Sequence, residues 1–213
     1  MFSLELCGLT KCYNERLIFS EVTASLSQGN CLVVTGANGS GKSTLLKILA
    51  GLIRPTSGKV KFSIKGAALS PSKQKEFIGF VAPDLFLYEE LTALENLKFF
   101  AEVRGLSFQD RDYTLLLEKL QLKKWSENLV STYSSGMKQR LKFAFALLHT
   151  PFLLILDEST SNLDEAGQAL VREIVGEQKE KGAVVFSTND PAEVVRYGDQ
   201  VLNLGPSGRG PVQ

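Results

Sequence analysis

The sequence predicts an α/β fold around a buried parallel sheet, and three features of the chain lead to that prediction. An apolar run of strand type precedes the glycine-rich segment 36–44, and apolar residues at helical spacing follow it. Two further apolar runs, 152–156 and 183–187, flank a helical pattern near 165–179. A strand, a helix and a second strand in this order form a βαβ unit, whose strands are parallel and buried on both faces.

The remaining elements follow from the periodicity of apolar residues. Strands are expected at 2–6, 17–26, 31–35 and 58–63. The period becomes helical from Leu91 to Leu148, which indicates an inserted helical region. The glycine- and proline-rich stretch 205–213 is expected to form a flexible tail.

The composition is that of an ordinary globular protein. Of the 213 residues 44% are apolar, which is enough for a full core without a disulfide or a metal. The net charge of +1, with acids and bases interspersed, predicts no nucleic-acid partner. Cys7, Cys12 and Cys31 lack C-x-x-C spacing and are expected to be reduced thiols of a cytoplasmic protein. We expect neither a signal peptide nor a transmembrane helix, so that membrane work would fall to another chain.

Residues 36–44 read Gly-Ala-Asn-Gly-Ser-Gly-Lys-Ser-Thr, which matches the phosphate-binding loop G-x-x-x-x-G-K-[ST]. Its glycines let the backbone curl, so that successive N–H groups face phosphate oxygens at the positive end of the following helix. Lys42 would place its charge toward the β- and γ-phosphates, and Ser43 would offer its hydroxyl to Mg²⁺. The loop therefore predicts binding of a nucleoside triphosphate. No Asn-Lys-x-Asp guanine motif is present, which disfavours a GTPase.

Two acids, Asp157 and Glu158, directly follow the apolar run 152–156. Parallel sheets bind ligands at the carboxyl ends of their strands. We expect Asp157 to complete the Mg²⁺ site with Ser43, and Glu158 to polarise the attacking water. A solvated strand end is the alternative interpretation of these two acids.

A third motif lies between the loop and the two acids. Ser134 can cap a helix and Gly136 lets the backbone approach an anion, although a plain helix start explains the motif equally well. The motif is followed by about a dozen helical residues, by Pro151, by the strand ending in Asp157-Glu158 and by the segment 161–164. This order and spacing resembles the nucleotide-binding domain of ATP-binding cassette (ABC) proteins, and the resemblance covers nearly the whole chain.

This resemblance implies a P-loop NTPase fold with a RecA-like core, an N-terminal antiparallel β subdomain and an inserted helical subdomain. The chain would form a single ABC ATPase domain over 1–213. The ATP-binding core would comprise 1–82 and 151–204, and the helical subdomain would comprise 83–150.

The resemblance also implies roles for single residues. Tyr13 sits where an aromatic ring stacks on adenine, Glu158 matches the catalytic base, and Asp164 matches a loop that crosses a dimer interface. Ser134 and Gly136 match the signature motif, which contacts the γ-phosphate bound to the opposite protomer. In the phosphate loop, the residues expected to contact ATP are Gly36, Asn38, Gly39, Ser40, Gly41, Lys42, Ser43 and Thr44. Ser43 and Asp157 would hold Mg²⁺.

The same resemblance implies partners and a location. A head-to-tail homodimer would sandwich two ATP molecules, and each subunit would drive separate transmembrane permease subunits from the inner face of the cell membrane. The loop 83–90 and the helix 91–103 would form the groove for a permease helix. Phe86, Leu87 and Tyr88 are candidate contacts there, and packing inside the helical lobe is the alternative. The segment 91–97 resembles the haem-exporter type of ATPase.

Two positions depart from the family pattern. Pro83 stands where a glutamine usually meets Mg²⁺ and the attacking water, and proline has no side-chain donor. Its neighbour Asp84 can ligate a metal but would repel the γ-phosphate. Asn189 stands where a histidine usually contacts the γ-phosphate, and its amide donates a hydrogen bond without carrying a charge. We therefore expect an ATPase with slow turnover, in which Glu158, Asn189 and Asp84 are the candidate catalytic residues.

Two other functions remain open from the sequence. One is a soluble ABC protein outside transport, although such proteins usually carry two cassettes or a long coiled-coil insertion. The other is a regulatory nucleotide-binding module with very low hydrolysis, which Pro83 and Asn189 make a serious alternative.

Overall fold

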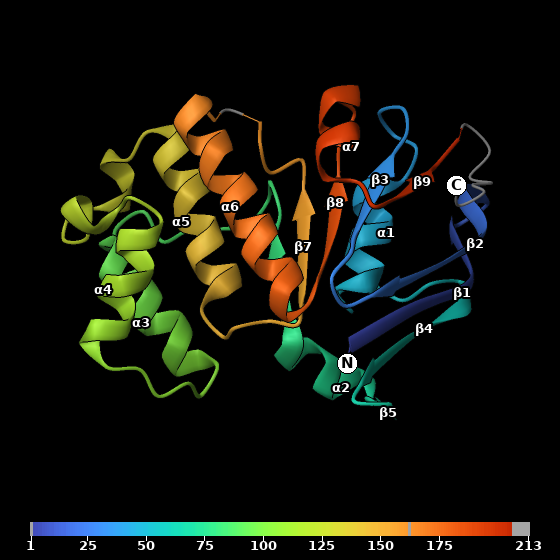
Figure 1. Ribbon diagram of the computed structural model, residues 1–213, viewed down its shortest axis with the longest axis horizontal. Helices are drawn as coiled ribbons and strands as arrows, with labels where there is room; N and C mark the ends of the chain where they lie inside the picture. Colours follow the sequence, from blue (N-terminus) through green and yellow to red (C-terminus); the bar gives the residue numbers. More distant parts are fainter. Residues whose placement is uncertain (1, 162, 206–213) are drawn as a thin grey trace.

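The computed structural model describes residues 2–161 and 163–205, and Figure 1 shows their arrangement. A five-stranded parallel sheet has the order β6-β7-β8-β3-β9. Its strands are β6 (Ile78–Val81), β7 (Leu153–Asp157), β8 (Ala183–Ser187), β3 (Cys31–Thr35) and β9 (Gln200–Asn203). The predicted α/β fold with a buried parallel sheet is confirmed. The short β6 and β9 at the two edges of this sheet were not predicted from the sequence.

A second sheet is antiparallel and comes from the N-terminal part of the chain. Its order is β2-β1-β4-β5, formed by β1 (Phe2–Tyr13), β2 (Arg16–Ser27), β4 (Ser57–Ile64) and β5 (Ala67–Ala68). The predicted strand over 2–6 is too short, because β1 continues to Tyr13. Its register with β2 shifts between Leu6 and Leu9, where Gly8 has a φ of 57°. This bulge interrupts the alternation of apolar residues that predicts a strand.

One group of helices lies beside β7, on the side away from β3 (Figure 1): α3 (Ala93–Val103), α4 (Asp110–Lys119), α5 (Ser135–Leu147) and α6 (Glu165–Lys181). Tyr197 of α7 (Pro191–Tyr197) belongs to the same apolar cluster as this group. In contrast, α1 (Lys42–Leu49) packs in a cluster with the antiparallel sheet, and the short α2 (Pro71–Gln74) precedes β6. Short 3₁₀ turns are η1 (Lys75–Phe77), η2 (Lys123–Trp125) and η3 (Val130–Thr132). Within residues 2–161 and 163–205, every helix is too short or too polar to cross a membrane.

Burial on both faces explains why the parallel strands read as continuous apolar runs. Along β7, Leu154 and Leu156 belong to a cluster that includes apolar residues of α5, α6 and the other helices of that group. Leu153 and Ile155 belong to a second cluster, which includes α1 and the inner face of the antiparallel sheet. The polar side chains that follow these strands therefore gather at the carboxyl edge of the sheet.

The structure does not test two parts of the predicted organisation, the division into subdomains and the flexible tail. The division into a core over 1–82 and 151–204 and a helical subdomain over 83–150 stays a prediction. The predicted flexible tail over 205–213 lies, except for its first residue, outside the described residues.

The single histidine of the chain, His149, follows the end of α5 and is half-buried. Its Nε2 atom lies 3.0 Å from the carbonyl oxygen of Ile78 at the start of β6. Burial, together with the charge of Arg104, lowers the pKa of His149 from 6.5 to about 4. The imidazole is therefore neutral in the folded protein at pH values at which the unfolded chain is already protonated.

We predict that the folded state loses stability as the pH falls from about 6.5 to about 4, because the unfolded chain binds a proton that folded His149 does not bind. In His149→Gln the amide still donates to the Ile78 carbonyl but does not titrate. Thermal melts across this pH window should show a smaller fall in Tm for the variant than for the wild type. Parallel falls would contradict the assignment.

Candidate nucleotide-binding site

The phosphate-binding loop leaves β3 at Thr35 and enters α1 at Lys42. Gly36, Gly39 and Gly41 have φ values of 145°, 79° and 100°, in the left-handed region that favours glycine. A Cβ atom at position 36 would lie 2.4 Å from the Leu204 carbonyl oxygen, and one at position 41 would lie 2.6 Å from Cγ2 of Ile18. Conformation and space thus both require glycine at positions 36 and 41, whereas conformation alone favours it at position 39.

Lys42 is 5% exposed and points back over its own loop. Its Nζ atom donates to the carbonyl oxygens of Gly36 at 2.9 Å and Ala37 at 3.3 Å, and lies 3.9 Å from Oε1 of Glu158. The buried hydroxyl of Ser40 has no hydrogen-bond partner among the described residues. The loop therefore combines a shielded cation with an orphaned polar group, a combination that suits a phosphate oxygen.

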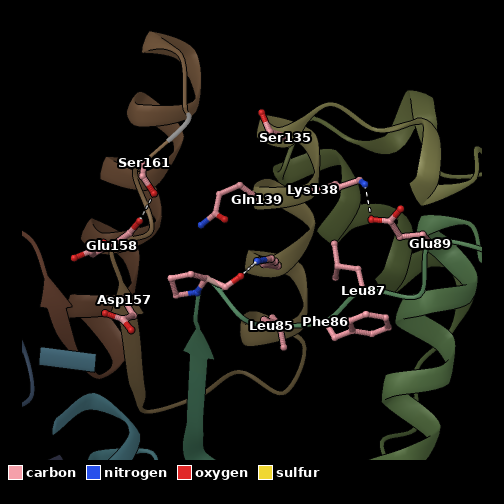
Figure 2. A pocket seen from close by; sticks show the side chains of 12 residues that line it. Leu85, Phe86, Leu87, Glu89, Ser135, Lys138, Gln139, Asp157, Glu158 and Ser161 are labelled. Carbon is pink, nitrogen blue, oxygen red and sulfur yellow. Dashed lines mark hydrogen bonds and ion pairs between the residues drawn. The ribbon is translucent and has the colours of Figure 1, made fainter. Parts of the chain in front are cut away.

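Asp157 and Glu158 lie at the end of β7, as predicted (Figure 2). Asp157 is 2% exposed, and its Oδ1 atom accepts a hydrogen bond of 2.6 Å from the hydroxyl of Ser187 on β8. The backbone of Glu158 is left-handed, with φ of 45°. Its N–H donates to the Ser187 hydroxyl at 3.1 Å, and its carbonyl accepts a 2.6 Å bond from the hydroxyl of Ser161. These bonds fix a strained turn that directs the Glu158 side chain toward Lys42 and solvent.

The residues predicted to hold Mg²⁺ offer the donors that this ion prefers. Ser43 is an exposed hydroxyl in the first turn of α1, and Asp157 is a carboxylate at the sheet edge. Mg²⁺ usually takes one or two such oxygens and completes its shell with phosphate oxygens and water. The donor set fits Mg²⁺ on this chemistry. No group of three or more acidic, cysteine or histidine side chains that could hold a metal occurs in the described part of the chain.

Asn189 contacts the phosphate loop, whereas Tyr13 lies at the end of β1 and contacts Lys11. Tyr13 ends β1, is 48% exposed, and has the Lys11 Nζ atom 4.6 Å from its ring centroid, which is a cation–π distance. Asn189 follows β8, and its amide donates a hydrogen bond to the side-chain oxygen of Asn38 in the loop. The structure therefore brings together Asn38 and Asn189, two positions that are distant in the sequence.

Asp84 follows Pro83 in the loop after β6, but it faces α1 and not the two acids of β7. Its Oδ2 atom lies 2.7 Å from Nζ of Lys47, an exposed ion pair. This hydrogen bond lowers the pKa of Asp84 and raises the pKa of Lys47. Asp84 is thus occupied by a cation of the helix that carries the phosphate loop.

Ser134 caps α5, as its sequence context allows, and accepts a 3.2 Å hydrogen bond from the N–H of Met137. Gly136 lies in the first turn of the same helix. The next residues of α5 face the acids of β7 across a cavity of about 330 Å³ (Figure 2). Asp164 caps α6 through a 2.8 Å bond from the N–H of Gly167. Its predicted role in a dimer interface stays a prediction.

Sequence reasoning missed three residues that position the predicted ones. Ser187 binds Asp157 and Glu158, and its place as the last residue of a buried strand beside β7 was the available signal. Lys47 pairs with Asp84, and Lys142 of α5 donates to the carbonyl oxygens of Ala82 and Pro83. Neither lysine stands out from an ordinary helical surface residue in the sequence alone.

The strand, the left-handed glycine loop, the shielded lysine and the acids at the neighbouring strand end together define a P-loop nucleotide-binding domain. A family model described as ABC transporter matches residues 19–161. A solved "Structure of ATP binding subunit of ABC transporter" superimposes with a TM-score of 0.85, at 32% identity, over 99% of this chain and 89% of that one. The chain belongs to the ABC transporter family, a family of ATPases, as an ATP-binding domain.

Curated relatives agree with this assignment. The lantibiotic transport ATP-binding protein SrtF of Streptococcus pyogenes is 36% identical over 92% of this chain and 84% of its own length. The uncharacterized ABC transporter ATP-binding protein YdbJ of Bacillus subtilis is 36% identical over 93% of this chain and 65% of its own. ABC transporter A family member 1 of Dictyostelium discoideum is 30% identical, and the match covers 24% of that protein. The chain thus spans 84% of the first of these relatives, just under two thirds of the second and about a quarter of the third.

We predict that Ser187→Ala lowers the ATP turnover number about tenfold, because Asp157 loses a buried hydrogen bond and the Glu158 turn loses a support. ATP affinity should change little, since the phosphate loop is untouched. The Tm should fall by about 2–8 °C, as expected for a loss of 1–2 kcal/mol. Steady-state kinetics and thermal melts measure both effects. Ser25→Ala, at an exposed position of β2, is the control.

Proposed function

We propose that this protein binds and hydrolyses ATP as the motor subunit of an ABC transporter, and that separate transmembrane permease subunits carry the substrate. The observation that carries this proposal is the convergence of Lys42, Asp157 and Glu158 at one edge of the parallel sheet. The signature helix α5 faces the same acids within the chain. A phosphate clamp, a metal ligand and a base are the parts that ATP hydrolysis requires.

The proposed roles come from the family resemblance, and the position of Lys42 beside Glu158 supports them. Lys42 neutralises the β- and γ-phosphates, and Glu158 orients and deprotonates the attacking water from its exposed position beside Lys42. Ser43 and Asp157 would hold Mg²⁺, which supplies positive charge to the phosphate oxygens when it is bound. Tyr13 would stack on the adenine.

Two departures lower the expected rate. Pro83 contributes no side-chain donor at the metal, and Asn189 contributes a neutral amide that is bonded to Asn38. Charged hydrogen bonds are about twice as strong as neutral ones, so a loss of 1–3 kcal/mol, or roughly tenfold to a hundredfold in rate, is the expected consequence. We propose slow hydrolysis for this reason.

A head-to-tail homodimer is part of the proposal. Ser134 and Gly136 at the start of α5 would contact the γ-phosphate bound to the partner, and Asp164 would lie at the interface. ATP would then contact both protomers only in the closed state, so that its binding shifts the population toward closure. Hydrolysis would reopen the dimer and return the permease to its other conformation.

An apolar cavity of about 270 Å³ supports a permease groove between the sheet and the helical region. It is lined by Leu52, Phe80, Leu85, Phe100, Arg104 and Phe145, among others. Phe86 is 72% exposed, and its ring centroid lies 5.9 Å from that of Tyr88, which contacts Phe99 and Phe100. We propose that a permease helix places side chains in this cavity, and that Phe86, which lines the neighbouring cavity of about 330 Å³, and Tyr88 extend the contact surface.

In the proposed transporter the permease subunits select the transported substrate. One relative's name concerns lantibiotic transport, and the resemblance of residues 91–97 to the haem-exporter type stays a prediction. The proposed location is the cytoplasm, at the inner face of the cell membrane, through the permease.

We predict measurable Mg²⁺-dependent ATP hydrolysis by the purified protein and its loss in Glu158→Gln. The Pro83→Gln, Asn189→His double variant should turn over faster than the wild type by about tenfold, since it restores a donor and a titratable cation. Steady-state phosphate release measures all three proteins. ATP binding without turnover in both the wild type and the double variant would favour a regulatory nucleotide-binding module instead.

We also predict ATP-dependent dimerisation in the Glu158→Gln background, because bound ATP then persists. Size-exclusion chromatography with light scattering should show a dimer with ATP and Mg²⁺ and a monomer without them. Adding Ser134→Arg should keep the protein monomeric while ATP still binds. Ser131→Arg, at an exposed position of η3 three residues before Ser134, is the matched control. A dimer that survives Ser134→Arg would overturn the proposed interface.

A further inference from the structure

The loop after β6 joins the sheet edge to the helical region, and it is held from two sides. On one side, Nζ of Lys142 on α5 donates to the carbonyl oxygens of Ala82, at 3.3 Å, and Pro83, at 2.5 Å. On the other side, Lys47 of α1 binds the Asp84 carboxylate at 2.7 Å. Three consecutive loop residues therefore bridge α1 and α5.

The two bridged helices are the ones whose N-termini carry the predicted phosphate contacts. α1 begins in the phosphate loop, and α5 begins at the cap residue Ser134. Through residues 82–84, a side chain in the second turn of α1 is connected to a side chain two turns into α5. A shift of one helix relative to the other must stretch or break this connection.

Lys142 also shares a helical face with Gln139, because the two are three residues apart. The Nε2 atom of Gln139 donates to the carbonyl oxygen of Ser159 at 2.9 Å, in the loop after β7. In Figure 2, Gln139 extends from α5 toward Asp157 and Glu158, whereas Lys138 extends away toward Glu89. One face of α5 thus fastens both loops that border the two acids.

Lys142 lies in a partly desolvated position, and burial lowers its pKa. Carbonyl oxygens of the loop replace part of its hydration. A charge-assisted donor to a carbonyl forms a stronger link than a neutral amide would. Pro83 has no side-chain donor of its own, so that Lys142 contacts this loop through the backbone carbonyl oxygens of Ala82 and Pro83.

We propose that Lys142 is a positioning residue for ATP hydrolysis, and that the connection Lys47–Asp84–Pro83–Lys142 sets the signature helix relative to the phosphate-loop helix. It acts through the backbone of the loop and does not touch ATP. The proposal deepens the proposed function and rests on it, since it concerns closure of the two helices around ATP.

The test compares wild type, Lys142→Met, Lys142→Arg, Asp84→Asn and the Lys142→Met, Asp84→Asn double variant. We expect Lys142→Met to lower kcat about tenfold while ATP affinity, measured with a fluorescent ATP analogue, stays within about twofold. Lys142→Arg should recover most of the rate, because a guanidinium can also donate to two carbonyls. The double variant should be no slower than the slower single variant, as expected for two parts of one connection. Lys123→Met removes an exposed lysine paired with Glu118 and serves as the control.

Three results would overturn the proposal. One is a Lys142→Met rate equal to that of the wild type. Another is a rate that falls only in proportion to ATP affinity or to the folded fraction measured by thermal melts. The third is a double variant whose losses multiply. Should the wild type show no turnover, the proposed hydrolysis fails separately, and ATP-dependent dimerisation in the Glu158→Gln background replaces kcat as the readout. Lys142→Met must then raise the ATP concentration needed for dimerisation at unchanged ATP affinity, and no change would sink the proposal.

Discussion

Burial of the parallel sheet on both faces constrains where this protein can do chemistry. The five strands are covered by helices on one side and by α1 with the antiparallel sheet on the other, so that polar groups collect where the strands end. The Ser187–Asp157 hydrogen bond joins β8 to β7 at that edge. The same serine supports the strained turn at Glu158, and Glu158 in turn approaches Lys42. Asp157 and the turn at Glu158 are thus held by the neighbouring strand β8.

The sequence was most informative at positions where the structure accepts only one type of residue. Gly36 and Gly41 could be identified because backbone conformation and close packing exclude every other residue there. The acids at 157 and 158 could be placed because they directly follow an apolar run, and parallel sheets bind ligands at the carboxyl ends of their strands. The extent of β1 and the edge strands β6 and β9 could not be read, since Gly8 breaks the alternation and the edge strands are only four residues long.

The positioning residues escaped sequence analysis for a different reason. A lysine on a helix is usually a solvated side chain, and nothing in the spacing of Lys47 or Lys142 says that each reaches the loop after β6. Asp84 was predicted to face the reaction, and its bond to Lys47 gives it a structural partner instead. Its part in catalysis stays a prediction. The effect of Pro83 and Asn189 on turnover therefore also depends on their contacts, which are Lys142 at the Pro83 carbonyl and Asn38 at the Asn189 amide.

The central claim is that each ATP site is shared between two protomers, and a mixing experiment tests it directly. Protomers carrying Ser134→Arg retain the phosphate loop, whereas protomers carrying Lys42→Ala retain the signature motif, and each protein alone should be inactive. Random mixing should restore activity above that of either protein alone and to at most half of the wild-type rate, because only a mixed dimer joins an intact phosphate loop to an intact signature motif, and it does so at one of its two sites. A mixture as inactive as its two components would contradict the shared site.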